Sequence, residues 1–248
     1  MSRILDKSEF LILLKDIVDK LESSSIRYEI PFTHKDKTVF DSIKIIVPQE
    51  INVTELEQLF SSNQYELKGR FIDFYYKDFR IVFIKAVETE FFITFFYYSW
   101  DILPTLMNVM FNKMGLDLTP SGLRYIGSSK SFMVSSNIKH IIEFLDLDFD
   151  FYMKYGFRTI FDQVSFITTS SYFNQNIFKE YELNKNDFFY LEKKSTYDYA
   201  KNLFDDFSKI NFHGYEYNNN LDSYVLNIDT MFEGSNFLKN VTRDKFIK

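Results

Sequence analysis

Residues 28–48, YEIPFTHKDKTVFDSIKIIVP, carry the pattern from which the fold of the N-terminal half is predicted. Residues 43–47 are mostly isoleucine and valine and end at Pro48, which is typical of a buried strand whose continuation is blocked. Residues 27–30 form a second extended segment, and the loop between the two carries mixed charge. We therefore predict that residues 27–30 and 43–47 pair as the two strands of a hairpin.

Apolar periodicity predicts the elements on either side of this hairpin. Apolar residues recur at helical spacing over residues 8–22, which indicates an amphipathic helix. Asn52 and Glu55 have the spacing of a capping box, which predicts a helix that ends near residue 60. Antiparallel strands are predicted at residues 65–67, 70–76 and 80–85, separated by Gly69 and a turn at 77–78. Further helices are predicted at residues 88–98, 104–114 and 196–210.

Composition narrows the classes of function. The chain of 248 residues contains no cysteine, so disulfides and thiolate metal sites are excluded. Its three histidines, His34, His140 and His213, are far apart, which argues against a histidine-built zinc site. The net charge of −6 argues against bulk, sequence-blind binding of nucleic acid, although a local basic groove is compatible with it.

No segment is predicted to enter a membrane. The longest apolar stretch, residues 91–100, contains Thr94 and Ser99 and is far shorter than the roughly 20 residues of a membrane-spanning helix. The apolar run near the N-terminus is broken by Lys15 and Asp16, and no small-residue cleavage site follows it. We therefore expect a cytoplasmic protein without a membrane partner.

The segment of residues 31–47 resembles the signature hairpin of the polymerase-X-like (DNA polymerase β-type) nucleotidyltransferases of large DNA viruses and phages. The family pattern is G-S-[FY]-R-R-G-K-x-x-x-G-D-[IL]-D between two strands, and the apolar framework of this chain matches it. The glycine and serine of the nucleotide-binding corner fall on Pro31 and Phe32. The two metal-binding aspartates fall on Ser42 and Lys44, and the third falls on Val82 in the run of residues 79–84.

Later segments extend the resemblance to about residues 10–205. Tyr97, Tyr98 and Ser99 match an aromatic-aromatic-Ser motif that contributes to the family's nucleotide and primer surface, but Trp100 replaces the glycine that follows. The family's helical thumb is matched in three places, residues 141–146, 156–159 and 170–178. The resemblance implies an α+β protein with a palm-like mixed sheet and flanking helices in residues 1–130. It further implies a helical thumb-like part in residues 131–210, followed by a tail in residues 211–248.

The replaced ligands imply a protein without the family's chemistry. Two-metal nucleotidyl transfer needs carboxylates that hold two Mg²⁺ ions, and serine, lysine and valine stand at the three positions. We therefore expect no cofactor, no catalytic residue and a catalytically inactive binding or scaffolding subunit of a viral or phage replication, transcription or RNA-processing complex. The competing hypothesis is an active, Mg²⁺-dependent enzyme with displaced carboxylates, for which Asp41, Asp73 and Glu88 are the candidates.

A third hypothesis is a non-catalytic module that binds nucleic acid. Its candidate phosphate contacts are Lys35, Lys37, Lys44 and Arg158. For Lys44 the alternative is a solvated strand lysine, and for residues 34–37 it is an exposed polar loop. The basic-aromatic residues 237–248 are either a docking segment or a frayed terminus.

Aromatic residues stand where the family has polar site residues, and they allow two interpretations. The positions concerned are Phe32, Phe40, Phe188, Phe189 and Tyr190. They either fill the former nucleotide site as core, or they form an apolar surface for a protein partner, which we expect the protein to have.

Charged residues elsewhere are predicted to have structural roles. Asp146, Asp148 and Asp150 alternate, so they could bind a cation from an extended strand, or cap the helix that follows. For the strand arginines Arg70, Arg80 and Arg124, ion pairing is the default expectation.

Overall fold

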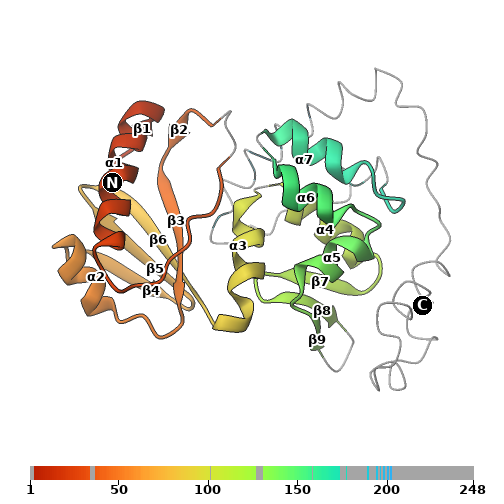
Figure 1. Ribbon diagram of the computed structural model, residues 1–248, viewed down its shortest axis with the longest axis horizontal. Helices are drawn as coiled ribbons and strands as arrows, with labels where there is room; N and C mark the ends of the chain where they lie inside the picture. The colour runs from red at the N-terminus through yellow and green to blue at the C-terminus, as the bar shows by residue number, and fades with distance from the viewer. Residues whose placement is uncertain are drawn as a thin grey trace. The chain divides into compact units, whose positions relative to one another are not determined.

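The computed structural model of the chain describes residues 3–33, 37–100, 102–126, 131–157 and 159–173, with seven isolated residues between 177 and 202. The chain divides into two compact units, Met1–Trp100 and Asp101–Lys248. Both contain helices and strands, which confirms the α+β class (Figure 1). The division follows Trp100, whereas the sequence interpretation places a boundary after residue 130. The predicted tail, residues 211–248, lies outside the described residues.

A four-stranded mixed sheet is the centre of the first unit (Figure 1). Its strands lie in the order β3 (Ser42–Pro48), β6 (Phe79–Ala86), β5 (Phe71–Tyr76) and β4 (Tyr65–Lys68). The pairs β4–β5 and β5–β6 are antiparallel, as predicted, and β3 runs parallel to β6. Tight turns with positive φ at Gly69, Lys77 and Asp78 connect the antiparallel strands.

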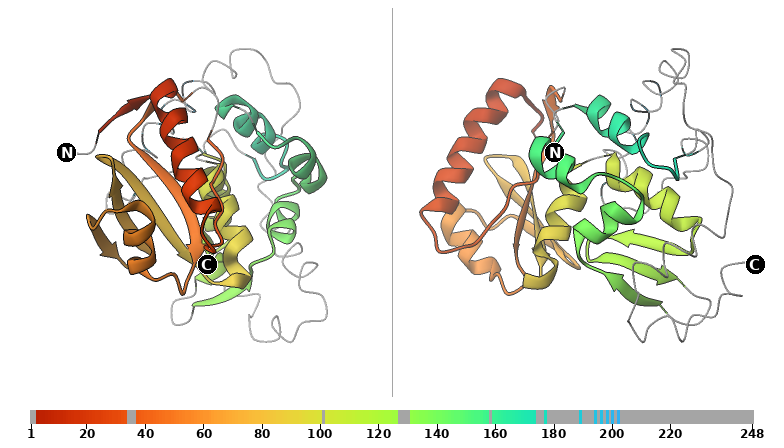
Figure 2. Two further views of the ribbon diagram at one scale, coloured as in Figure 1. Left: turned by 60° about the vertical axis from the view of Figure 1, so that its left-hand side comes forward. Right: turned by 45° about the vertical axis from the view of Figure 1, so that its right-hand side comes forward.

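Two helices cover one face of this sheet, as the views in Figure 2 show. The first, α1 (Lys7–Glu22), begins at Asp6, which forms a capping box with Glu9. The second, α2 (Val53–Phe60), begins at Asn52, whose side chain accepts from the Thr54 N–H. Both helices were predicted from the sequence. They enclose a core whose members include Phe10, Ile17, Leu21, Leu56, Phe60, Ile45, Phe74 and Phe83.

The predicted hairpin strand at residues 27–30 is wrong in extent. Only one antiparallel bridge remains, in which Glu29 and Ile46 exchange backbone hydrogen bonds of 2.8 and 3.0 Å. Pro31 has no N–H to continue a ladder, which accounts for the early end of this pairing. The short strand β2 (Val39–Phe40) instead pairs with β1 (Leu5–Asp6) in a separate two-stranded sheet.

The other face of the sheet contacts the helix α3 (Phe91–Ser99), which follows a 3₁₀ turn, η1 (Glu88–Glu90). The rings of Phe71 and Tyr98 meet edge-on with centroids 6.4 Å apart. The helix predicted at residues 88–98 is thereby confirmed. This second face carries the polar side chains described below.

The second unit combines a three-stranded antiparallel sheet with four helices among its described residues. The strands β7 (Leu116–Thr119), β8 (Gly122–Ile126) and β9 (Ser131–Ser135) lie in that order. The helices are α4 (Leu103–Asn112), α5 (Ile138–Phe144), α6 (Phe149–Tyr155) and α7 (Ile160–Ile167). β9 shows that the segment of residues 131–210, expected to be helical, begins with a strand. Most of the helix predicted at 196–210 falls outside the described residues.

The buried side chain of Gln163 holds the start of α4. The N-cap residue Ile102 has no side chain able to accept a hydrogen bond, and the Oε1 of Gln163 accepts from the Ile102 and Leu103 N–H groups at 3.3 and 3.2 Å. Gln163 comes from α7 and is fully buried. A polar residue at this core position therefore satisfies two of the backbone donors that every helix leaves unpaired at its N-terminus.

Candidate functional site

The sheet of the first unit brings together the three positions at which the family resemblance expects metal ligands. Ser42 and Lys44 are two residues apart on β3, so their side chains leave the same face. In the parallel register, Lys44 lies directly opposite Val82 on β6, and Ser42 lies opposite Arg80. Val82 in turn faces Asp73 on β5. The interaction of strands far apart in sequence therefore places the three positions in one patch.

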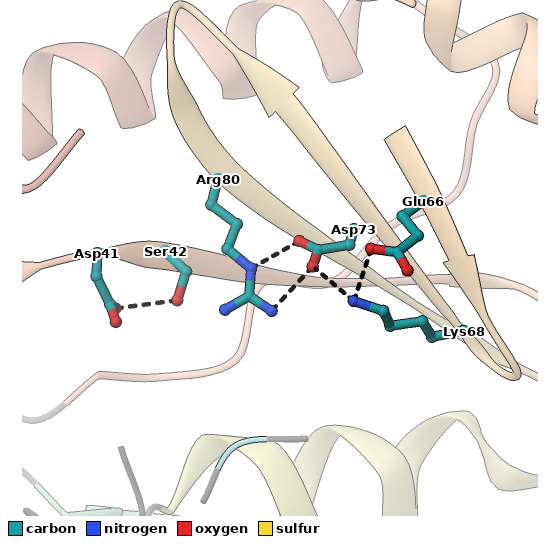
Figure 3. Close-up of polar contacts among 6 residues, drawn as sticks. All are labelled: Asp41, Ser42, Glu66, Lys68, Asp73 and Arg80. Atoms are coloured by element: carbon teal, nitrogen blue, oxygen red, sulfur yellow. Dashed lines mark hydrogen bonds and ion pairs between the residues drawn. The ribbon is translucent and has the colours of Figure 1, made fainter. Parts of the chain in front are cut away.

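The acid in this patch is bound by an arginine (Figure 3). The Nε of Arg80 donates to Oδ1 of Asp73 at 2.6 Å, and its Nη2 donates to Oδ2 at 3.1 Å. The side chain of Asp73 is only 6% exposed and that of Arg80 is 22% exposed. Bidentate hydrogen bonding of this kind, between a guanidinium and a carboxylate, is among the strongest interactions that two side chains make. The ion pair predicted for Arg80 is thereby confirmed.

Further charges on β4 and β3 flank this pair. The Nζ of Lys68 lies 2.7 Å from Glu66 and 3.9 Å from Asp73. At the opposite side, the Ser42 hydroxyl donates to Asp41 at 3.1 Å (Figure 3). We call Ser42, Lys44, Glu66, Lys68, Asp73, Arg80 and Val82, with Asp41 at the margin, the sheet site.

The sheet site is electrically balanced. It contains three basic side chains, Lys44, Lys68 and Arg80, and three acids, Asp41, Glu66 and Asp73. Burial opposes the charge of Arg80, but Asp73, with smaller contributions from Tyr75 and Asp41, outweighs burial and raises the pKa of the guanidinium above its usual value. The hydrogen bond to Glu66 likewise raises the pKa of Lys68.

The two motifs that the resemblance relates to the family's nucleotide surface are in contact within the first unit. The Phe32 N–H donates to the Ser99 hydroxyl at 3.2 Å. The Phe32 ring lies 5.2 Å from the Phe95 ring and 5.3 Å from the Trp100 ring, measured between centroids. Trp100 is buried, whereas Phe32 is 56% exposed. Aromatic side chains therefore occupy the corner where the family has glycine and serine.

Two of the other aromatic positions lie in the described part of the chain and are buried, and Phe40 belongs to the core that α1 and α2 enclose. Phe40 is buried and stacks on Phe10 with ring centroids 3.9 Å apart. Phe189 is also buried. Phe188 and Tyr190 lie outside the described residues.

Two of the four candidate phosphate contacts, Lys37 and Lys44, lie in the described part of the chain. Lys44 is half-buried within the sheet site, and Lys37 lies near the Phe40 ring, with its Nζ 5.5 Å from the centroid. Lys35 and Arg158 lie outside the described residues. The basic groove expected of a nucleic-acid-binding module stays a prediction.

The displaced carboxylates of the enzyme hypothesis are only partly brought together. Asp41 and Asp73 both lie close enough to Arg80 to raise the pKa of its guanidinium. Glu88, however, pairs with Arg27 beyond the end of β6. Because β6 continues for six residues from Arg80 to Ala86, a rise of about 3.3 Å per residue puts Ala86 roughly 20 Å from Arg80, and Glu88 lies beyond Ala86.

Of the alternating acids of the second unit, Asp148 has the helix-capping role that was predicted as the alternative to a cation site. Asp148 is the N-cap of α6, and its Oδ1 accepts from the Phe151 N–H at 2.8 Å. Asp146 accepts a hydrogen bond from the Ser171 hydroxyl. Across the described ranges, no group of three or more His, Cys, Asp or Glu side chains has an arrangement able to hold a metal ion.

No protein-family model matches this chain, and no curated protein matches it either. Within the part of the chain that the structure describes, no helix is both long and apolar enough to cross a bilayer.

Proposed function

We propose that this protein is a catalytically inactive, nucleotidyltransferase-like subunit. It would bind or scaffold other proteins in a cytoplasmic replication, transcription or RNA-processing assembly of a virus or phage. The viral context and the palm-like nature of the sheet come from the family resemblance. The observation that carries the proposal is the Arg80–Asp73 pair, in the patch where the resemblance expects metal ligands.

The chemistry of this pair opposes a two-metal centre. Nucleotidyl transfer by two metal ions requires carboxylate oxygens open to Mg²⁺. Both oxygens of Asp73 accept hydrogen bonds from Arg80, and Lys44 adds a second cation on the neighbouring strand. A guanidinium is charged at every physiological pH, so a metal ion would have to displace it from a mostly buried partner. We infer that the guanidinium of Arg80, which is part of the chain, supplies the positive charge that a bound metal ion would supply beside Asp73.

The convergence of the expected positions supports the family correspondence itself. Ser42 and Lys44 share a face because they are two residues apart on one strand, so the independent observation is that Val82, from a strand far away in sequence, lies directly opposite Lys44. This pairing, and the contact of Phe32 with Ser99, are the arrangement that the correspondence requires. The fold would then be retained as a binding surface, with exposed Phe32 available to a partner.

The proposal is tested by purifying the full-length chain from its native host under mild conditions. We expect stoichiometric protein partners, and no nucleotide incorporation with Mg²⁺ or Mn²⁺ on DNA or RNA primers. Incorporation that Asp73→Asn abolishes would establish the displaced-carboxylate enzyme instead. Binding of nucleic acid without incorporation, with a steep salt dependence, would establish the nucleic-acid module.

The correspondence is tested by restoring the ligands. The variant Ser42→Asp/Lys44→Asp/Val82→Asp places carboxylates on the three clustered positions, and bound Mn²⁺ would stabilise it by an amount that rises with [Mn²⁺]/Kd. We expect its melting temperature to rise with Mn²⁺ while that of the wild type does not. The control Ser42→Asp/Lys44→Asp lacks the third ligand and should respond much less. Equal responses of both variants would contradict the assignment of Val82.

A further inference from the structure

The outer edge of the strand β4 is open to solvent. β4 is the last strand in the sheet order and, among the described residues, pairs only with β5. All four of its residues are exposed, including the apolar side chain of Leu67 at 57% and that of Tyr65 at 40%. Such an edge presents unpaired backbone groups to any strand that adds to it.

The backbone directions at this edge follow from the β4–β5 ladder. The Tyr75 N–H donates to the Gln64 carbonyl at 2.9 Å, so Gln64 directs its backbone groups toward β5. Because this direction alternates in an antiparallel pair, Glu66 and Lys68 also face β5, whereas Tyr65 and Leu67 direct their N–H and C=O groups outward. A strand added at this edge would therefore exchange hydrogen bonds with Leu67.

We propose that β4 pairs with β4 of a second copy of this chain, antiparallel about a two-fold axis at Leu67. In this register Leu67 faces Leu67 of the partner subunit, and Glu66 faces the partner's Lys68. The same pairing occurs again on the other side of the axis, with Lys68 opposite the partner's Glu66. The two four-stranded sheets would become one continuous sheet.

Charge complementarity selects this partner and this register. A charged edge usually prevents strand addition, because like charges meet across the new pair. In β4, Glu66 and Lys68 lie two residues apart on one face of the sheet. A two-fold rotation about Leu67 therefore places each of these charges opposite the complementary charge of the second copy. A register centred on Glu66 would set two glutamates directly opposite each other, which is destabilising. The contact is small beside the roughly 1,600 Å² of a typical stable interface, so the dimer is weak.

Sedimentation velocity of the purified full chain, from about 10 μM to 1 mM, tests the proposal, since weak dimers populate only at high concentration. We expect concentration-dependent dimerisation that Glu66→Lys and Lys68→Glu each weaken by about tenfold or more, because symmetry counts every altered pair twice. The double variant Glu66→Lys/Lys68→Glu restores the complementary pattern and should dimerise like the wild type. Lys15→Glu, on the exposed side of α1, controls for the change in net charge.

Mixing the two single variants provides the sharpest outcome. Glu66→Lys has two basic side chains on this strand and Lys68→Glu has two acidic ones, so each variant alone repels its own copy. In the mixture every basic side chain of the first variant faces an acidic side chain of the second, so a heterodimer should form. A wild type that is monomeric at every concentration overturns the proposal. Dimerisation that both single charge reversals leave unchanged also overturns it, because the interface would then lie elsewhere.

Discussion

Replacing Arg80 by methionine should destabilise the first unit because it leaves Asp73 buried without its partner. Removal of one member of a buried ion pair costs about 3–5 kcal/mol. Arg80 is 22% exposed, and Lys68 lies 3.9 Å from Asp73 and can partly replace it. We therefore expect a loss of about 2–3 kcal/mol in the free energy of unfolding, which is less than the loss expected for a fully buried ion pair. Urea denaturation followed by circular dichroism measures it.

Two matched variants separate the ion pair from general damage. Arg80→Met/Asp73→Leu removes both charges and should recover stability to within about 1 kcal/mol of the wild type, because an apolar replacement avoids the desolvation of both groups. Arg27→Met breaks the exposed pair with Glu88 and should change the free energy of unfolding far less than Arg80→Met, because solvent screens an exposed pair. If Arg80→Met costs no more than Arg27→Met, or the double variant is less stable than Arg80→Met, the assigned role of Arg80 is refuted.

Three further predictions concern other parts of the fold. The hydrogen bond from Lys77 lowers the pKa of Asp16, so Asp16→Asn should remove a small stability that exists above the unfolded-state pKa and is lost as the pH falls below about 4; urea titrations at pH 3 to 7 measure this difference. Gly122→Ala should cost several-fold more stability than Gly69→Ala, since a Cβ at Gly122 would lie 2.4 Å from a carbonyl oxygen of β9 while Gly69 has open space; equal melting temperatures would contradict this. Gln163→Leu should lower the free energy of unfolding by about 2–4 kcal/mol by leaving two N–H groups of α4 unsatisfied, and Gln163→Glu, which keeps an acceptor, should cost less.

Local patterns were sufficient to predict most elements of the first unit. The spacing of Phe10, Ile17 and Leu21 predicted α1, and Asn52 predicted the start of α2. These signals depend only on neighbouring residues. The pairing at residues 27–30 is shorter than predicted for an equally local reason, because Pro31 has no N–H with which to continue the ladder.

The partner of Arg80 could also have been read from the sequence. The turn at residues 77–78 sets Tyr76 opposite Phe79, and this register makes Asp73 the diagonal neighbour of Arg80. The sequence interpretation predicted an ion pair without naming its acid. The parallel register that sets Ser42 opposite Arg80, in contrast, could not be predicted from the sequence. It connects strands separated by 38 residues, and no local pattern sets it.

The long-range contacts of the second unit could not be predicted from patterns of neighbouring residues. A buried glutamine such as Gln163 is unfavourable in a helix core unless it has partners, and its partners come from a helix about 60 residues away. The strand β9 follows a short segment outside the described residues and was missed, because a five-residue run with Phe132, Met133 and Val134 does not distinguish strand from helix.

Manganese binding by the unmodified chain tests the central claim most directly. Electron paramagnetic resonance of free Mn²⁺ can be recorded while the wild type is titrated, with and without a nucleoside triphosphate. With Arg80 on Asp73 and Lys44 beside it, we predict no saturable binding tighter than millimolar. One or two Mn²⁺ ions bound per chain at micromolar affinity, and lost in Asp73→Asn, would contradict the claim and make this sheet a metal-dependent active site.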